Sequence, residues 1–472
     1  MNRLKKKNAR QKSFFFEDYS ESEIIFNNKK TNIVKISSNR IALLFFVFLS
    51  LMFVFSIKII YLSLHKQENL FIKNTNKVFL KERRDIVDRN GTILARNINI
   101  YDAGIRPKMV KDKKKLLINL KLIFPEIDEN KFKNNLKKDK FFYIKKRLTE
   151  DQYTKLWLIG DKAITFSKKQ YRIYPQKNLF SHILGQTDDS NIGISGVEKY
   201  FEKNLKNKEL LNSPINLTLD ANLQYLIREE LNKAKLNFNT IGSAAILMNA
   251  EDGEVLSLVS LPDYDLNKRF LINDGVYTNK ITKGVYELGS VFKTFTIAAG
   301  LENEVIDTNT IFKNLESNLR CDKYRITEHD KLPKNLNVEE ILIRSSNIGS
   351  IRIAQKIGIE KYKNFLNSLE LLKKINFDLE EVGTPLTFKW GKCKLATASY
   401  GHGITTTPLQ LARAYAILGN GGYKISPSIL KKNETKKQRE KIISEETSNK
   451  INLILRKVVS HDEGTANFAD IE

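Results

Sequence analysis

The most apolar stretch of the chain lies near its N-terminus. Residues 41–57 are apolar apart from two serines, and beyond Lys58 the apolar pattern continues to Leu62. A hydrocarbon core about 30 Å thick needs roughly 20 such residues in a helix, and a lysine near the end can extend its ammonium group to the interface. The pattern therefore predicts a transmembrane anchor over residues 39–62, preceded by a basic tail over residues 1–38.

A cleaved signal peptide is the alternative interpretation of this stretch. The apolar core of a signal peptide is shorter, starts closer to the N-terminus and leads to small residues at the cleavage site. Here roughly forty residues come first and bulky Tyr61 and Leu62 follow, so an uncleaved anchor is favoured. Lysine and arginine in the tail suit the cytoplasmic side, but lysines also follow the stretch, so charge alone favours this orientation only weakly.

Beyond the anchor, short strand-like runs alternate with helical patterns. Residues 63–215 combine such runs with a Lys-rich helical stretch between Lys111 and Arg147, and no repeat period is visible. Asp220 then precedes an amphipathic pattern over residues 221–236, which predicts a helix with Asp220 as its N-cap. The mixture predicts an α+β protein rather than an all-α or all-β one.

Two further patterns predict the interior of the C-terminal part, residues 216–472. Apolar runs at residues 244–248 and 254–259 flank the turn Glu251-Asp252-Gly253 and predict a β-hairpin. Six apolar residues from position 291 to position 299 lie nearly all round a helix, as expected of a buried central helix: Val291, Phe292, Phe295, Ile297, Ala298 and Ala299. With 472 residues, of which 41% are hydrophobic, the chain is long enough for two or more domains with cores of their own.

A candidate for nucleophilic chemistry lies at the start of this apolar helix. Ser290 and Lys293 are three residues apart, so on a helix the lysine ammonium can reach the serine hydroxyl, as a nucleophile and its base require. A lysine can take a proton from serine only if burial lowers its pKa. Gly289, just before, allows the backbone to turn tightly into the helix.

The Ser-x-x-Lys spacing is weak evidence by itself. Ser63 with Lys66 and Ser428 with Lys431 share it, and Ser-x-Asn occurs both at residues 37–39 and at residues 345–347. The first copies adjoin the predicted anchor, and Ser428 follows a proline in a polar stretch, so their contexts do not suit a catalytic helix. The choice of Ser290 therefore depends on the rest of the chain.

Several segments together resemble one protein family. Tyr286–Lys293 and Ser345–Asn347 resemble the active-site boxes of the penicillin-binding protein and β-lactamase superfamily. Further segments resemble class B penicillin-binding proteins in order and spacing, namely Arg83–Gly91, Arg172–Pro175, His182–Gly185, Gly193–Glu198, Leu217–Asp220, Gly401–Ile404 and Thr407–Gln410. The resemblance covers most of the chain, and its joint pattern is highly specific. The first of these segments and the basic tail are more similar to the division-type enzyme than to the elongation-type enzyme.

The resemblance implies an arrangement and a function. The arrangement is an anchor helix, an elongated pedestal (dimerisation) domain over residues 63–215, and a transpeptidase domain over residues 216–472 in which helices flank an antiparallel sheet. The function is cross-linking of peptidoglycan stem peptides during septal wall synthesis at the bacterial inner membrane, with the catalytic domain in the periplasm. Implied partners are stem peptides, β-lactams, glycan-polymerising division proteins and the bilayer; no nucleic acid, metal or cofactor is implied.

The resemblance also implies roles for four side chains. Ser290 would attack the penultimate carbonyl of a D-alanyl-D-alanine peptide and form an acyl-enzyme, with Lys293 as general base. Ser345 would relay the proton to the leaving amine, and Asn347 would orient Lys293 and the substrate amide. We interpret His182 and His402 as structural.

Two departures from the family pattern bear on these expectations. Leu288 stands where relatives usually have proline, and the Lys-Thr-Gly box expected beyond Glu463–Ala466 does not occur. That box supplies a groove wall, a cation for the substrate carboxylate and an oxyanion-hole N–H, and loss of one such donor costs roughly a hundredfold in rate. We therefore expect a truncated chain that alone is inactive and poorly folded in its catalytic half, with exposed apolar surface and an open sheet edge.

Other interpretations remain open. Asp88–Gly91 alone would be an ordinary hairpin turn, and Gly193 and Gly196 ordinary loop residues. A non-catalytic membrane-anchored division scaffold and an elongation-type paralogue are alternatives for the whole chain. A β-lactam sensor or β-lactamase is disfavoured, because it would lack the pedestal.

Charge and cysteine content add little. The net charge of +25 is spread along the chain rather than gathered in one recognition motif, which favours solvated lysine-rich faces over nucleic-acid binding, with attraction to anionic lipid or wall polymer as a second explanation. Cys321 and Cys393 define neither a disulfide framework nor a metal site, and we favour the unpaired state.

Overall fold

The computed structural model describes residues 23–26, 29–66, 82–268, 274–322, 324–386, 388–431 and 439–471. The chain divides into two compact units, residues 1–80 and 81–472, and each is described by itself. Most of the predicted basic tail, including its residues from Arg3 to Lys12, lies outside the described residues.

The described part of the first unit contains a short hairpin and a long helix. Strands β1 (Glu23–Phe26) and β2 (Lys29–Asn32) pair antiparallel and lead into α1 (Ile33–Lys66). Within α1, Arg40–Tyr61 is the one segment of the described residues that is long and apolar enough to cross a membrane, with 22 residues and a mean hydropathy of 2.6. At 1.5 Å per residue it is about 33 Å long, which matches a hydrocarbon core. The predicted anchor therefore forms the expected helix.

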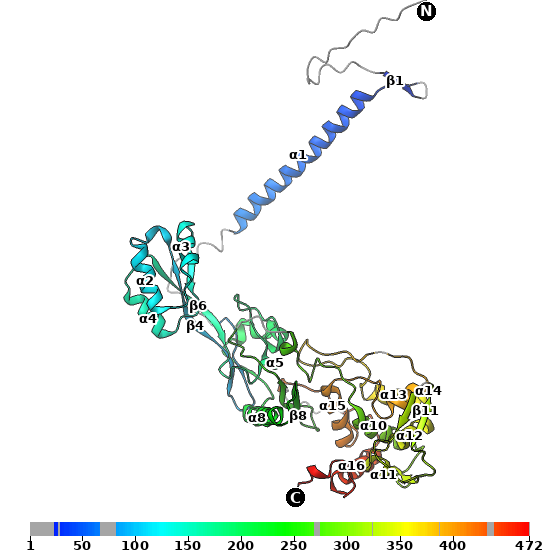
Figure 1. The fold of residues 1–472 in the computed structure, drawn as a ribbon. Helices are drawn as coiled ribbons and strands as arrows, with labels where there is room; N and C mark the ends of the chain where they lie inside the picture. The colour runs from blue at the N-terminus through cyan, green and yellow to red at the C-terminus, as the bar shows by residue number, and fades with distance from the viewer. Residues whose placement is uncertain are drawn as a thin grey trace, which may run out of the picture. The chain divides into compact units, whose positions relative to one another are not determined.

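The pedestal is built on a five-stranded sheet. Its strands are β3 (Ile86–Val87), β4 (Ile93–Ile105), β5 (Phe142–Lys145), β6 (Ile164–Ile173) and β7 (Ile215–Asn216). The long strands β4 and β6 pair antiparallel and run from a small helical lobe toward the catalytic half (Figure 1). In that lobe α2 (Lys113–Ile123), α3 (Glu129–Lys137) and α4 (Glu150–Leu158) enclose a separate apolar core.

The prediction of one Lys-rich helical stretch between Lys111 and Arg147 is partly wrong. Helix α2 ends at Ile123, just before Pro125, which cannot continue it, and α3 follows. The last part, Phe142–Lys145, forms β5 because its Phe-Tyr-Ile sequence favours a strand and pairs with β4.

The residues around Asp88 form a turn and also belong to the wider resemblance. The Asp88 carboxylate accepts hydrogen bonds from the backbone N–H groups of Asn90 (2.9 Å) and Thr92 (2.7 Å), between β3 and β4. Nearby, the buried carboxylate of Glu198 binds both Arg83 (2.7 Å) and Arg172 (2.6 Å). This buried ion cluster accounts for Arg83, Arg172 and Glu198, one residue from each of three pedestal segments, since an unpaired buried charge is strongly unfavourable.

The catalytic half begins as predicted. Asp220 accepts hydrogen bonds from Asn222 and Leu223 and caps α8 (Ala221–Phe238), and β8 (Ser243–Met248) and β9 (Val255–Leu261) form the predicted hairpin. Apolar side chains are strongly exposed at and after the end of α8, with Leu236 83% and Ile241 98% exposed. These side chains belong to α8 and the loop that follows it, so an exposed apolar sheet face and poor folding remain predictions.

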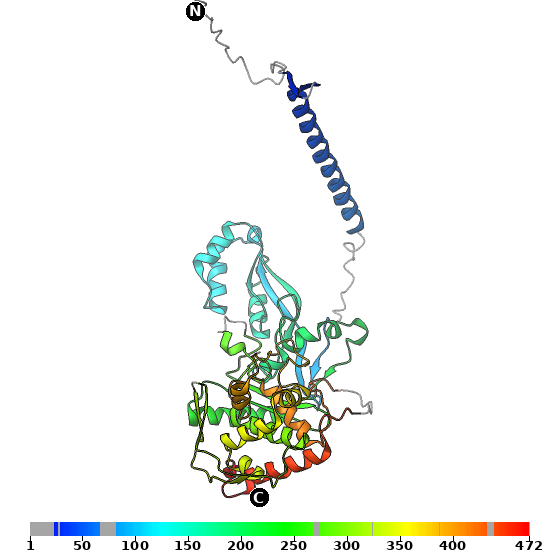
Figure 2. The same ribbon diagram turned by 90° about the vertical axis from the view of Figure 1, so that its right-hand side faces the viewer.

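A helical core surrounds the predicted central helix. Helix α10 (Lys293–Glu302) is buried from Lys293 to Leu301. Around it pack α11 (Val338–Ile343), α12 (Asn347–Ile357), α13 (Ile359–Ser368), α14 (Lys392–Ala398), α15 (Pro408–Gly419) and α16 (Glu445–Ser460) (Figure 2). The central-helix prediction is therefore confirmed for residues 293–299.

Short elements complete the described fold. The short helices are α5 (Ser181–Leu184), α6 (Gly196–Tyr200), α7 (Glu202–Leu205) and α9 (Asp274–Tyr277). The 3-10 turns are η2 (Pro107–Met109), η3 (Lys208–Leu210), η4 (Gly289–Phe292) and η5 (Asn467–Ala469). Two small antiparallel pairs join β10 (Ile311–Phe312) with β13 (Leu336–Asn337) and β11 (Asn318–Cys321) with β12 (Tyr324–Thr327).

The unpaired state favoured for the cysteines is wrong. Cys321 at the end of β11 and Cys393 in α14 form a disulfide, with Cα atoms 5.5 Å apart. The two residues are separated by 72 positions, and the pairing depends on how β11 packs beside α14. Nothing local in the sequence reports such a contact.

Candidate active site

Ser290 lies in a tight turn that the sequence predicted in part. Gly289 has a φ of +67°, a conformation that glycine adopts at low cost, and Ser290 follows it in η4. The α-helix itself begins only at Lys293. Because a 3-10 turn has three residues per turn, Ser290 and Lys293 still lie above one another. The side chain of Ser290 is exposed, and that of Lys293 is buried beneath it.

The segment from Gly401 to Thr406 packs against the residues just before Ser290. Tyr286 and Thr406 exchange two backbone hydrogen bonds of 2.9 and 3.0 Å. A Cβ atom added to Gly401 would lie 2.0 Å from the carbonyl oxygen of Gly289, so glycine is required for this close approach. The Gly401–Ile404 segment of the resemblance therefore contacts the residue just before Ser290.

Lys293 holds the two candidate serines together. Its ammonium group donates to the Ser290 hydroxyl (3.2 Å) and to the Ser345 hydroxyl (2.8 Å), and it also contacts the Ser345 carbonyl oxygen closely. Burial lowers the pKa of Lys293 from 10.5 to about 8, and the nearby carboxylate of Glu328 opposes this shift. A lysine with such a pKa is partly neutral near physiological pH and can accept a proton from serine.

Ser345, Ser346 and Asn347 join two helices. Ser345 follows α11 with a φ of +56°, and Ser346 caps α12 by accepting a hydrogen bond from Gly349. The Asn347 side chain lines the same cavity as Ser290 and donates to the carbonyl of Thr327 (2.9 Å). Orientation of Lys293 by Asn347 therefore remains a prediction.

Glu328 is a residue of this site that sequence reasoning missed. Its carboxylate accepts hydrogen bonds from the Ser346 hydroxyl (2.6 Å) and from the backbone N–H groups of Asn347 (2.7 Å) and Ile348 (3.0 Å). The sequence offered one weak signal, a carboxylate directly after a strand-like run and before the Ser-Ser-Asn segment.

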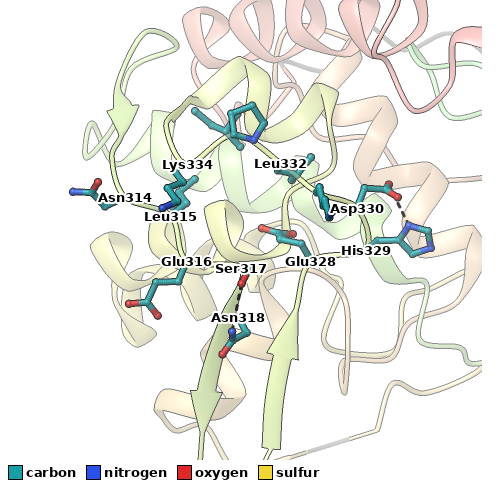
Figure 3. Close-up of a pocket in the computed structure, with 13 residues that line it drawn as sticks. Asn314, Leu315, Glu316, Ser317, Asn318, Glu328, His329, Asp330, Leu332 and Lys334 are labelled. Carbon is teal, nitrogen blue, oxygen red and sulfur yellow. Dashed lines mark hydrogen bonds and ion pairs between the residues drawn. The ribbon is translucent and has the colours of Figure 1, made fainter.

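The site opens into a cavity of about 400 Å³. All four predicted residues line it, and they are joined by Glu287, Gly289, Glu328, His329, Asp330, Leu332, Arg344, Tyr400, Gly401, His402 and Thr465. A second cavity of about 880 Å³ (Figure 3) shares four lining residues with it, Glu328, His329, Asp330 and Leu332. Among the described residues, no group of three or more His, Cys, Asp or Glu side chains could hold a metal ion.

The histidines and the alternative serines have other surroundings. His182 is partly buried with its Nε2 atom 2.7 Å from the Val276 carbonyl, and desolvation lowers its pKa, which suits a structural role. His402 was interpreted in the same way, but it lines the cavity and lies 3.3 Å from Glu287. Ser428 is buried and donates to Asp378 (2.7 Å), so its match to the motif is coincidental.

A buried lysine shared by an exposed serine and a second serine defines a serine acyl-transfer enzyme of the Ser-x-x-Lys class. Comparison with known proteins identifies the family within this class. Residues 243–472 match the penicillin binding protein transpeptidase domain, and residues 81–213 match the penicillin-binding protein dimerisation domain.

The alignments with similar proteins cover most of this chain and at least two thirds of each relative described next. The chain is 30% identical over 394 residues to the probable peptidoglycan D,D-transpeptidase FtsI of Caulobacter vibrioides, covering 82% of this chain and 67% of that protein. It is 30% identical over 461 residues to the FtsI of Buchnera aphidicola (87% and 78% covered) and 27% identical over 440 residues to stage V sporulation protein D of Bacillus subtilis (84% and 68%). The chain belongs to the class B penicillin-binding proteins, and it is a peptidoglycan D,D-transpeptidase of this type.

Proposed function

We propose that this transpeptidase cross-links stem peptides during septal wall synthesis, with Ser290, Lys293, Ser345 and Asn347 as its catalytic set. The observation that carries the proposal is the position of the Lys293 ammonium between the hydroxyls of Ser290 and Ser345. The similarity to proteins named FtsI supports the septal role.

The proposed reaction transfers the acyl group twice, first to Ser290 and then to the acceptor amine, and each transfer moves one proton: the Ser290 proton goes to the leaving amine, and a proton of the acceptor amine returns to Ser290. The Ser290 oxygen attacks the carbonyl of the penultimate D-alanine while its proton passes to neutral Lys293. The peptide bond breaks, and Ser345 relays that proton to the departing amine of the terminal D-alanine. An amino group of a second stem peptide then attacks the ester and restores the Ser290 hydroxyl. Asn347 holds Lys293 and the substrate amide. A β-lactam acylates the same oxygen.

The proposal includes the setting of the reaction. The anchor α1 is a single pass through the inner membrane with the N-terminus in the cytoplasm, so that the catalytic half lies in the periplasm where the wall is assembled. Glycan-polymerising division proteins in the membrane supply the strands to be cross-linked. The pedestal extends from residue 63 to residue 215, and the catalytic domain starts at residue 216.

The nucleophile is tested by two matched substitutions in the gene at its own locus. Membranes carrying Ser290→Ala should lose labelling by a fluorescent penicillin, because no acyl-enzyme can form. Ser428→Ala removes a serine with the same Ser-x-x-Lys spacing and should retain labelling. Labelling of Ser290→Ala would show that another residue is acylated and would refute Ser290 as the nucleophile. No labelling of the unaltered protein would favour a non-catalytic scaffold. A label lost within minutes would favour a β-lactamase.

The septal role is tested by depletion of the protein. Cells without a septal transpeptidase should grow as filaments and fail to divide. Rounded or widened cells would instead indicate the elongation-type paralogue.

We further propose that a polypeptide of these 472 residues alone is inactive. It contains no Lys-Thr-Gly tripeptide, so its groove lacks the wall, cation and N–H donor that this box supplies in relatives. The recombinant 472-residue chain should not be labelled under conditions in which the product of the native gene is. Equal labelling of the two would contradict this proposal.

A further inference from the structure

Glu328 stands at the junction of the two cavities. It is the first residue after β12 and lines both the active-site cavity and the larger one beside it (Figure 3). Glu328 lies outside both motif segments, Tyr286–Lys293 and Ser345–Asn347, and its side chain is only partly buried. Its surroundings therefore need an explanation.

The carboxylate of Glu328 binds the first residues of α12. Three donors converge on its two oxygens: the Ser346 hydroxyl and the N–H groups of Asn347 and Ile348, at 2.6, 2.7 and 3.0 Å. The first N–H groups of a helix lack partners within the helix, and a negative charge there is favoured by the helix dipole. Hydrogen bonds to a charged acceptor are the strong ones, so this contact fixes the start of α12.

Fixing α12 also fixes the groups that contact Lys293. Ser345 directly precedes the capped residues, and its own N–H donates to Leu342 of α11 (3.1 Å). The strand end that carries Glu328 also accepts the Asn347 side chain, through the Thr327 carbonyl. One strand end therefore holds Asn347 by its backbone and by its side chain, and holds Ser345 through the chain between them.

The hairpin that presents Glu328 is itself held in place. Ile326 of β12 is buried in the helical core, and Cys321 of the paired strand β11 is bonded to Cys393 in α14. A shift of the hairpin would have to strain the disulfide or remove Ile326 from the core. The position of the carboxylate is therefore set by the fold rather than by a flexible loop.

We infer that Glu328 is a positioning residue of the transpeptidase: it holds Ser345 and Asn347 in register with Lys293 by binding the start of α12, and the hairpin tied by the Cys321–Cys393 disulfide holds Glu328. The inference rests on the proposed roles of Ser290, Lys293, Ser345 and Asn347. It assigns no chemistry to Glu328, which does not touch the reacting atoms in this arrangement.

The charge of Glu328 has a second, opposite effect. A nearby carboxylate favours the protonated form of Lys293, so it raises the pKa that burial lowers. The other charged or titratable groups that line the cavity are Glu287, His329, Asp330, Arg344, Tyr400 and His402. These stay unchanged when Glu328 alone is replaced.

The test compares Glu328→Gln with Glu328→Asp and with Glu316→Gln in the gene at its own locus. The rate of labelling by a fluorescent penicillin is measured in membranes from pH 6 to pH 10. Glu316 is the matched control, because it is an exposed glutamate that lines the larger cavity but not the active-site cavity. Thermal loss of labelling competence shows whether each variant is folded.

Glu328→Gln should label about tenfold to a hundredfold more slowly at pH 10, where Lys293 is neutral in every variant, because Ser345 and Asn347 are misplaced. The midpoint of its plot of labelling rate against pH should also move to lower pH, because the pKa of Lys293 falls when the negative charge is removed. The loss of rate relative to the unaltered protein should therefore be smaller at pH 6 than at pH 10. A merely structural defect would lower the rate by the same factor at every pH. Glu316→Gln should match the unaltered protein in rate at every pH.

Glu328→Asp keeps the charge on a shorter side chain, so it should label slowly with an unchanged midpoint. If Glu328→Gln does not fold, Glu328→Asp provides the test. Labelling of Glu328→Asp at the rate of the unaltered protein would overturn the inference. Unaltered labelling of Glu328→Gln at every pH would overturn it directly. Absence of labelling in the unaltered protein would instead refute the proposed function.

Discussion

The protonation of Lys293 should control the pH dependence of acylation. The side chain is 1% exposed, and burial lowers its pKa to about 8 against the opposing effect of Glu328. Only the neutral amine can take the proton of Ser290, so the rate should follow the neutral fraction of Lys293.

The expected profile follows from this pKa. The neutral fraction is about one half at pH 8, about one tenth at pH 7 and about one hundredth at pH 6. The labelling rate should therefore fall about tenfold for each pH unit below 7 and should level off above pH 9. A lysine at the ordinary value of 10.5 would instead give a rate that continues to rise through pH 10.

The assay is the initial rate of labelling by a fluorescent penicillin in membranes, at fixed ionic strength and over pH 6 to 10. Reagent incubated alone at each pH corrects for its alkaline hydrolysis, and samples returned to pH 8 test for irreversible loss of the enzyme. A rate that is independent of pH, or one that rises without a plateau to pH 10, would refute the role of burial in preparing Lys293 as the base.

The remaining predictions concern the framework around the site. Cys321→Ser removes the disulfide, which closes a loop of 72 residues, and should destabilise the catalytic half by about 4 kcal/mol. Thermal unfolding of this variant is compared with that of the unaltered protein, both oxidised and reduced. An unfolding temperature equal to that of the oxidised unaltered protein would contradict the prediction. Gly401→Ala brings a Cβ to 2.0 Å from the Gly289 carbonyl and should abolish labelling by displacing the turn before Ser290. Gly358 also has a positive φ (+81°), but a Cβ added there would meet no atom within 4 Å. Gly358→Ala should therefore cost about 1–2 kcal/mol of stability and retain labelling. Equal labelling of the two glycine variants would contradict the close approach.

Features set by neighbouring residues were predictable from the sequence. The anchor depends on an uninterrupted apolar run, the cap of α8 on Asp220, and the β8–β9 hairpin on two apolar runs around a turn. Each of these depends on positions close together in the sequence. The pair Ser290 and Lys293 stands before an apolar helix, but its choice over the other copies of the motif depended on the resemblance of segments along most of the chain. The structure divides the motif between a 3-10 turn and α10.

Features set by distant segments were not predictable in the same way. The Cys321–Cys393 disulfide and the contacts of Glu328 with α12 form only when the β11–β12 hairpin packs on the helical core. The strand β5 was missed for a related reason: its Lys-rich surroundings resemble a solvated helix, and its pairing partner β4 lies far earlier in the chain. In each case tertiary contact, rather than local propensity, decides the structure.

The contacts of Glu328 also determine how strongly its charge acts on Lys293. The carboxylate positions α12 but favours protonation of the base, and its three donors offset part of that negative charge. Ser346→Ala removes the shortest of these hydrogen bonds, so the charge should act more strongly on Lys293 and raise its pKa. The midpoint of the labelling profile should then move to higher pH, opposite to the shift expected for Glu328→Gln. Ser350→Ala, which removes a buried hydroxyl bonded to the Ser346 carbonyl (2.8 Å) and leaves the Glu328 contacts in place, is the control for a general disturbance of α12. A midpoint that stays in place or moves to lower pH in Ser346→Ala would show that these donors do not moderate the charge of Glu328.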